Sequence, residues 1–361
     1  MKKIFLFVLI VCMCFVLGAC TATDSDNLFG SVPEDTSSED IMYYTGAYQY
    51  GNMQQSSIHR FMLIDNEVVF DHYRYNEYDS LVFTRVFSYD LITAEVRSYC
   101  KDATCTHEKC ATSPLVTKLE VYNGKVYGKD NGMQVVEANE KGANIIVNSE
   151  VNDFFHHGDK LYVKTMDSSL VAFEEGKTEP QIILEEYTGN DPAIFGNYLY
   201  AKRNDTDYIR VDLTADEPQE EIIIENVYGK TDGQYIYYVD WETYQLYRCD
   251  MEGKNAELLV DQPVYPTSIN FDDEYFYYRL YTDMQKTEHP DSRDIYRFSK
   301  DDPSNSEKIA TLPRSIKLLY TVPGTGKLFI HVFHKSGDKD VTYYVLGTDG
   351  SNPTKLELPE Y

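Results

Sequence analysis

A short motif recurs seven times between residues 65 and 329, and this repeat constrains the fold more than any other feature of the chain. In each copy a polar turn containing Asn, Asp or Gly leads into a short strand-like segment that ends in an aromatic residue. The final aromatic residues are Phe70, Tyr127, Tyr162, Tyr200, Tyr237, Tyr277 and Phe329. The inner steps between them are 35 to 40 residues long, and the first and last are 57 and 52. A regular period of this length is typical of a repeat architecture.

Each copy contains further strand-like segments after the motif. In the clearest one, residues 244–249 and 256–260 flank an Asp250-Met251-Glu252-Gly253 turn. The chain holds 32 Tyr and 17 Phe, which suit a half-buried sheet surface, and the copies lack the 3.6-residue apolar spacing of helices. The pattern therefore predicts an all-β β-propeller over residues 41–361, with seven blades expected and six or eight as alternatives. We expect a strand from residues 43–64 to close the last blade.

The repeat resembles that of the TolB-like and related β-propeller lipoproteins of Gram-positive gut bacteria. The resemblance is clearest over Asp232 to Val260, where Asp232-Gly233 precedes Tyr235-Ile236-Tyr237-Tyr238 and Leu246-Tyr247-Arg248 precedes Asp250 and Gly253. It extends more loosely from about Ile41 to Leu358. The resemblance implies a propeller fold, whereas function is not implied, because propellers host binding, scaffolding and enzymatic roles alike.

The first 19 residues have the features of a lipoprotein signal peptide. Lys2 and Lys3 precede an apolar run of about thirteen residues, which is shorter than the roughly 20 that span a bilayer. Leu17-Gly18-Ala19-Cys20 then matches a lipobox. We expect cleavage before Cys20, lipid on its side chain, and a body held at the extracellular face of the cell membrane by this anchor alone. Residues 20–40 are rich in Ser, Thr, Asp and Glu, so they predict a flexible acidic tether.

The mature chain is strongly acidic. Removal of the signal peptide takes away Lys2 and Lys3, so 33 − 2 = 31 basic side chains remain. Against 59 acidic side chains they give a formal charge of 31 − 59 = −28. Nucleic acid would face a field of like charge, so we expect no nucleic-acid partner. The expected partner is a protein, a peptide or a glycan, and the expected state is a monomer.

The first long step of the repeat holds a cluster of metal-binding residue types. Cys100, Cys105, His107 and Cys110 lie within eleven residues and match the donors of a structural Zn site, although their spacing is not that of a standard zinc finger. A disulfide is the alternative outside the membrane, and free thiols are a third reading. The related propeller lipoproteins carry a similar cluster in the first blade. The resemblance therefore implies that the cluster is a family feature, but it does not say whether the cluster binds metal or forms a disulfide. Cys249 is expected to be a core thiol.

Trp241, the only Trp, is a candidate ligand contact because it lies in an Asp240-Trp241-Glu242-Thr243 turn, where packing against a neighbouring blade is the alternative. His156 and His157 immediately precede a repeat turn, so a structural role is expected.

No catalytic motif such as G-x-S-x-G or H-E-x-x-H is present, and no catalytic residue is predicted. The preferred function is a surface-anchored binding or scaffolding module. The alternative is a propeller hydrolase or lyase acting on extracellular glycans or peptides, with carboxylates from separate blades as acid and base.

Overall fold

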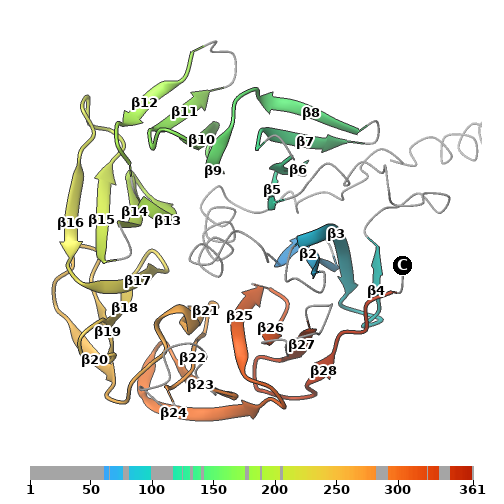
Figure 1. The fold of residues 1–361 in the computed structure, drawn as a ribbon. Coiled ribbons are helices and arrows are strands. Elements are labelled where there is room, and N and C mark those ends of the chain that lie inside the picture. Colours follow the sequence, from blue (N-terminus) through green and yellow to red (C-terminus); the bar gives the residue numbers. More distant parts are fainter. Residues whose placement is uncertain are drawn as a thin grey trace, which may run out of the picture.

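The described residues form seven four-stranded antiparallel sheets arranged around a common centre, as Figure 1 shows for this computed structural model. They comprise residues 61–359 except 65, 76–80, 99–116, 124, 131–132, 140–141, 175–178, 188, 204–205, 282–291, 323 and 333–341. The predicted seven-bladed β-propeller is therefore confirmed. In this part of the chain a 3-10 turn, η1 (Pro266–Ser268), is the sole helical element. No helix here is long and apolar enough to cross a bilayer.

Each blade is a meander of four consecutive strands. Blades 1 and 2 comprise β1 (Phe61–Ile64), β2 (Glu67–Tyr75), β3 (Leu81–Asp90), β4 (Val96–Ser98), β5 (Thr117–Tyr122), β6 (Lys125–Lys129), β7 (Val135–Asn139) and β8 (Gly142–Val147). Blades 3 and 4 comprise β9 (Val151–His157), β10 (Lys160–Thr165), β11 (Leu170–Glu174), β12 (Gln181–Leu184), β13 (Gly189–Phe195), β14 (Tyr198–Arg203), β15 (Asp207–Asp212) and β16 (Glu220–Ile224). Blades 5 to 7 comprise β17 (Val227–Thr231), β18 (Ile236–Asp240), β19 (Leu246–Cys249), β20 (Glu257–Val260), β21 (Asn270–Phe271), β22 (Tyr275–Tyr278), β23 (Asp294–Ser299), β24 (Asp302–Thr311), β25 (Ile316–Val322), β26 (Lys327–Val332), β27 (Thr342–Gly347) and β28 (Thr354–Lys355).

The recurring motif is the second strand of every blade. The seven copies coincide with β2, β6, β10, β14, β18, β22 and β26. A less distinctive first strand precedes each of them and lies innermost in the ring (Figure 1). Because each blade is a meander, its first-to-second and third-to-fourth turns lie on one side of the ring, which we call the turn face. Its second-to-third hairpin and the connections between blades lie on the other side, the loop face.

The ring closes differently from the sequence-based expectation. Phe61–Ile64 pairs with β2 in blade 1, whereas blade 7 takes its four strands from residues 316–355. The prediction that this segment closes the last blade is therefore wrong for its described part, and residues 43–60 lie outside the described residues. Closure instead uses an apolar cluster between blades 7 and 1, where the Phe61 ring lies 4.9 Å from Tyr320 and 4.8 Å from Phe329. Among the described residues blades 1 and 7 share no strand, so side-chain packing joins the two ends of the ring.

The core lies between neighbouring blades. Separate clusters of buried side chains join blades 2 and 3, 3 and 4, 4 and 5, 5 and 6, and 6 and 7. Because each sheet covers the apolar face of the next, every blade needs both neighbours to bury its side chains.

Buried or half-buried cationic side chains connect successive blades. Lys129, Lys164 and Arg279 occupy the same register, two residues after the motif aromatic, in β6, β10 and just after β22. Each donates to a carbonyl at the start of the next blade's inner strand. The acceptors are Asn152 (2.8 Å), Gly189 (2.9 Å), and Ile316 together with Lys317 (3.3 Å for Lys317). Asn152 and Lys317 are the extra residues of β-bulges, so their carbonyls lie outside the regular strand pairing and are available to the cations.

The Arg of the motif has a similar role on the turn face. Arg248 donates through Nη1 to the Lys300 carbonyl of the next blade (3.0 Å), and Arg297 donates in the same way to Thr348 (2.8 Å). Each guanidinium also pairs with a Glu on its own fourth strand. Arg248 lies over the ring of Tyr235, just before β18, and Arg297 lies over the ring of Tyr275, at the start of β22. The motif Arg is therefore part of the scaffold.

Candidate functional site

The predicted lipid site and metal cluster lie outside the described residues. Cys20, Cys100, Cys105, His107 and Cys110 are not described, so the lipid anchor and the choice between structural Zn, a disulfide and free thiols stay predictions. In the sequence, residues 99–116 lie between β4 and β5. Among the described residues, no group of three or more His, Cys, Asp or Glu side chains is placed to hold a metal ion.

Cys249 is a buried free thiol, as predicted. Its side chain lies in the core between blades 4 and 5, and Sγ lies 3.8 Å from the Ile236 carbonyl oxygen. Burial, with a smaller contribution from Asp250, raises the pKa of the thiol to about 12. The group is therefore a protonated core residue at neutral pH.

His156 meets a carboxylate that the local sequence did not reveal. Glu120 of β5 accepts from the His156 backbone N–H (2.8 Å) and lies 2.9 Å from Nδ1 of its ring. The imidazole also stacks on Tyr122 with ring centroids 4.5 Å apart. Both members of the pair are buried between blades 2 and 3, so the contact joins those blades, and the expected structural role of His156 agrees with this position.

Trp241 lies on the loop face at the tip of the β18–β19 hairpin. Asp240 Oδ1 shapes the hairpin by accepting from the backbone N–H groups of Glu242 (2.9 Å) and Thr243 (2.7 Å). The indole is half-buried, and its edge meets the Tyr244 ring at a centroid distance of 6.2 Å. It packs against the core cluster of blades 5 and 6, which leaves part of the ring at the surface.

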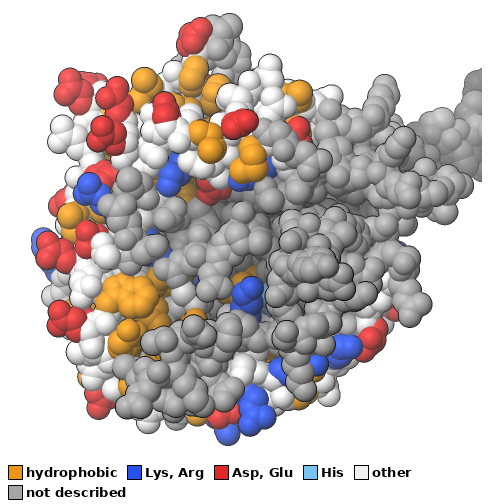
Figure 2. All heavy atoms as spheres, viewed as in Figure 1, with side chains coloured by type: hydrophobic (Ala, Val, Ile, Leu, Met, Phe, Trp, Pro, Cys, Tyr) orange, Lys and Arg blue, Asp and Glu red, His pale blue; other side chains and the backbone are white. Residues whose placement is uncertain are grey.

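Trp241 begins a series of aromatic rings that crosses from blade 5 to blade 6. Tyr244 meets Tyr281 edge-on at 5.2 Å, and Tyr281 meets Tyr265 at 5.0 Å. We call Trp241, Tyr244, Tyr281 and Tyr265 the aromatic ladder. All four rings are half-buried, and Figure 2 shows hydrophobic side chains gathered over blade 5. The ladder thus presents polarisable rings with polar tips at one blade boundary.

Arg279 supports the inner end of the ladder. Its guanidinium lies over the Tyr265 ring (4.6 Å) and is fully buried. Burial lowers the pKa of Arg279 to about 10, so the group stays charged at neutral pH. Burial and the neighbouring Tyr265 and Tyr244 raise the pKa of Tyr281 to about 12, so its phenol keeps its proton. Sequence reasoning missed Tyr265 and Arg279, although the basic residue after the motif was a usable signal for Arg279.

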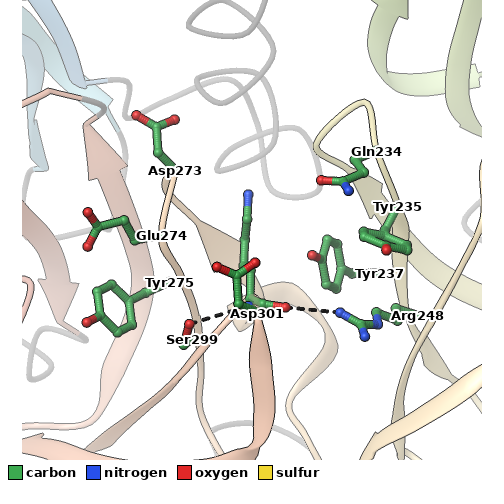
Figure 3. A pocket seen from close by; sticks show the side chains of 10 residues that line it. Gln234, Tyr235, Tyr237, Arg248, Asp273, Glu274, Tyr275, Ser299 and Asp301 are labelled. Atoms are coloured by element: carbon green, nitrogen blue, oxygen red, sulfur yellow. Dashed lines mark hydrogen bonds between the residues drawn. The ribbon is translucent and has the colours of Figure 1, made fainter.

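A concave site lies on the turn face, also between blades 5 and 6. It is a cavity of about 500 Å³, which we call the turn-face pocket, and Figure 3 shows its lining side chains. Three backbone turns contribute to it: residues 234–235 before β18, residues 273–275 at the start of β22, and residues 299–301 between β23 and β24. Its volume is within the range of small-molecule sites.

Comparison with known proteins shows the fold. No protein-family model matches the chain, and no curated protein matches it. It is similar to a puromycin-hydrolysing peptidase of Mycobacterium tuberculosis, with a TM-score of 0.55 and 11% identity over 92% of this chain and 57% of that one. It is also similar to a structure from a study of two prolyl endopeptidases, with a TM-score of 0.53 and 11% identity over 90% and 51%. An oligogalacturonate lyase in complex with manganese aligns with a TM-score of 0.40 and 14% identity over 56% and 62%.

These matches cover only part of the two peptidase structures. The chain spans little more than half the length of the two peptidase structures. At identities this low a likeness concerns the backbone arrangement and not the site chemistry. By its backbone arrangement, the chain is a β-propeller.

Proposed function

We propose that the chain is a lipid-anchored binding or scaffolding propeller of the cell surface, related to the TolB-like propeller lipoproteins. The lipobox ending at Cys20 and the acidic tether support the location. The anchor holds the chain in the membrane, while the propeller meets a protein, peptide or glycan outside the cell.

The aromatic ladder is the observation that carries this proposal. Trp, Tyr and Arg are enriched among the residues that dominate binding energy at interfaces, and rigid rings lose little conformational freedom on binding. Here they adjoin one another across a blade boundary, held by the Asp240 turn on one side and by Arg279 on the other. The loop face at blades 5 and 6 is the proposed contact surface.

We expect Trp241→Ala to weaken binding by at least about 30-fold, because loss of a central interface aromatic typically costs about 2 kcal/mol or more. The full-length protein would be screened against glycan and peptide arrays in two preparations. One is displayed on intact cells, and the other is purified in non-ionic detergent. Trp241→Phe keeps a ring and should retain most of the binding. Ile92→Ala, which truncates a 77% exposed side chain at the β3–β4 turn of the turn face, is the control.

The outcomes separate the candidate functions. Selective loss in Trp241→Ala at an unchanged melting temperature supports binding on the loop face. Equal binding by Trp241→Ala and Ile92→Ala would reject the ladder as the contact surface. Turnover of a glycan or peptide by the purified protein would replace the binding role with the hydrolase or lyase alternative.

The anchor predicts that Cys20→Ser releases the protein from membranes without unfolding the propeller. The lipid is the sole attachment in this proposal, and the tether separates it from the folded body. Fractionation of cells checks this: a Cys20→Ser protein that remains wholly in the membrane pellet would contradict the lipoprotein assignment.

A further inference from the structure

The turn-face pocket lies where blade 6 departs from the repeat. In blades 5 and 7 the turn between the third and fourth strands contains a glycine at positive φ, Gly253 (+74°) and Gly350 (+82°). Each glycine lies against a residue of the preceding blade's fourth strand, Ile223 or Ile309. In blade 6 the equivalent turn is a tighter hairpin in which Ser299 pairs with Asp302, and Lys300-Asp301 forms the tip. The cavity lies between this altered hairpin and blade 5.

The cationic groups of the pocket are already paired within the protein. Lys300 Nζ lies 2.8 Å from Oδ2 of Asp232, whose side chain is only 2% exposed. Arg248 pairs with Glu257 (2.8 Å) and donates to the Lys300 carbonyl, as Figure 3 shows. Neither cation is therefore available to a ligand without breaking an internal ion pair.

Three carboxylates line the pocket. Asp273, Glu274 and Asp301 are exposed, and within the described residues their side chains make no hydrogen bond or ion pair. In Figure 3 Asp273 and Glu274 lie on the wall from blade 6, and Asp301 lies between this wall and the blade 5 side chains. The open side of the cavity thus has an excess of negative charge.

Aromatic rings complete both walls. Tyr235 of blade 5 and Tyr275 of blade 6 are half-buried at equivalent register positions, each with a guanidinium over its ring. Tyr237 is buried behind them, and burial together with Asp232 raises the pKa of its phenol. Ring surface beside unpaired carboxylates suits an organic cation, whose alkyl part contacts rings while its charge meets carboxylates.

We propose that the turn-face pocket binds an alkylammonium group, carried either by a small free amine or by a lysine side chain of a peptide. The cavity has a volume of about 500 Å³, which is large enough for an alkyl chain with its charged end. This volume is far larger than that of a bare metal ion. The site is separate from the aromatic ladder, because the two lie on opposite faces of the ring.

Titration calorimetry of the full-length protein in non-ionic detergent at low ionic strength tests the proposal. The probes are cadaverine for the free amine and N-acetyl-lysine amide for the peptide side chain, with 1-pentanol and N-acetyl-norleucine amide as their uncharged counterparts. We expect the charged probes to bind at least about 10-fold more tightly than the uncharged ones, and binding to weaken with added salt. The tighter of the two amines identifies the source.

Matched variants separate the pocket from the general negative field of the protein. Asp273→Asn, Glu274→Gln and Asp301→Asn combined should weaken amine binding at least about 10-fold. The control variant combines Glu185→Gln, Asp216→Asn and Glu217→Gln, which remove the same number of negative charges at exposed sites elsewhere. It should change the affinity for the amine by less than about 2-fold. All six side chains are exposed, so both variants should keep the parent melting temperature.

Several results would overturn the proposal. These are the absence of heat with either amine, equal losses in the two triple variants, uncharged probes that bind as tightly as the amines, or complete displacement of the amine by stoichiometric Ca²⁺. Trp241→Ala should leave amine binding unchanged, so failure of the pocket and failure of the loop-face contact are distinguishable.

Discussion

At the scale of single residues, the side chains that define the repeat belong to the scaffold. Asp232 and Asp272 each accept two backbone N–H bonds in the turn before a second strand. Arg248 and Arg297 connect their blades to the next. The candidate pocket instead lies where copies differ, at the altered hairpin of blade 6, in which Lys300 occupies the position of Met251 in the neighbouring blade.

Cys249 provides a prediction at this scale. Burial raises the pKa of its thiol to about 12 from an ordinary value of 9.0, so its thiolate fraction at pH 8 falls by about 1,000-fold. We expect iodoacetamide to leave Cys249 unmodified in the folded protein and to label it in guanidinium chloride, as measured by peptide mass mapping. Labelling at equal rates in the two conditions would contradict the core position.

At the scale of the element, the turn between the third and fourth strands shows why the motif requires glycine. A Cβ on Gly253 would overlap the Ile223 side chain and lie 2.8 Å from the Ile223 carbonyl oxygen. Ile223 is the extra residue of a bulge in β16, and Ile309 in β24 has the same position relative to Gly350. The glycine and the bulge therefore belong to one contact between blades.

Gly253→Ala should destabilise the protein by roughly 2 to 4 kcal/mol, because it adds overpacking against the neighbouring blade to the strain of positive φ. Gly158→Ala is the matched control. Gly158 has a φ of +59°, but a Cβ added there would meet nothing within 4 Å, so only the backbone strain of about 1 kcal/mol applies. Urea denaturation measures the free energy of unfolding of both variants. Equal decreases in Gly253→Ala and Gly158→Ala would show that the contact between blades contributes nothing to stability.

At the scale of the whole molecule, the ring depends on apolar clusters between blades that contain many tyrosines. Burial raises the pKa of Tyr162 to about 12, and burial together with a nearby aspartate raises the pKa of Tyr237 and Tyr277. These phenols lie in different clusters and are almost completely buried. Their ionisation is therefore coupled to the integrity of the ring.

This coupling predicts alkaline unfolding. The folded pKa values lie above the value of 10.0 for a free phenol, so the native state keeps protons that the unfolded chain loses. The contribution to stability is complete below about pH 10 and is lost as the pH rises towards about 12, by about 1.4 kcal/mol per pH unit for each buried tyrosine. We expect tyrosinate absorbance at about 295 nm from these residues to appear together with loss of circular dichroism. Full tyrosine ionisation in a folded protein would contradict this.

The sequence by itself indicated seven blades, with six or eight as alternatives, and it located the second strand of each blade, because turn residues and alternating aromatics act within a few neighbouring residues. It also located Cys249 in the core. Only the tertiary structure decided which side chains meet across blade boundaries, such as Glu120 with His156 and Asp232 with Lys300. Those pairs are distant in the sequence and form only when neighbouring blades pack against each other. The same holds for ring closure, because Phe61–Ile64 pairs with β2, and among the described residues blades 1 and 7 are joined by side-chain packing.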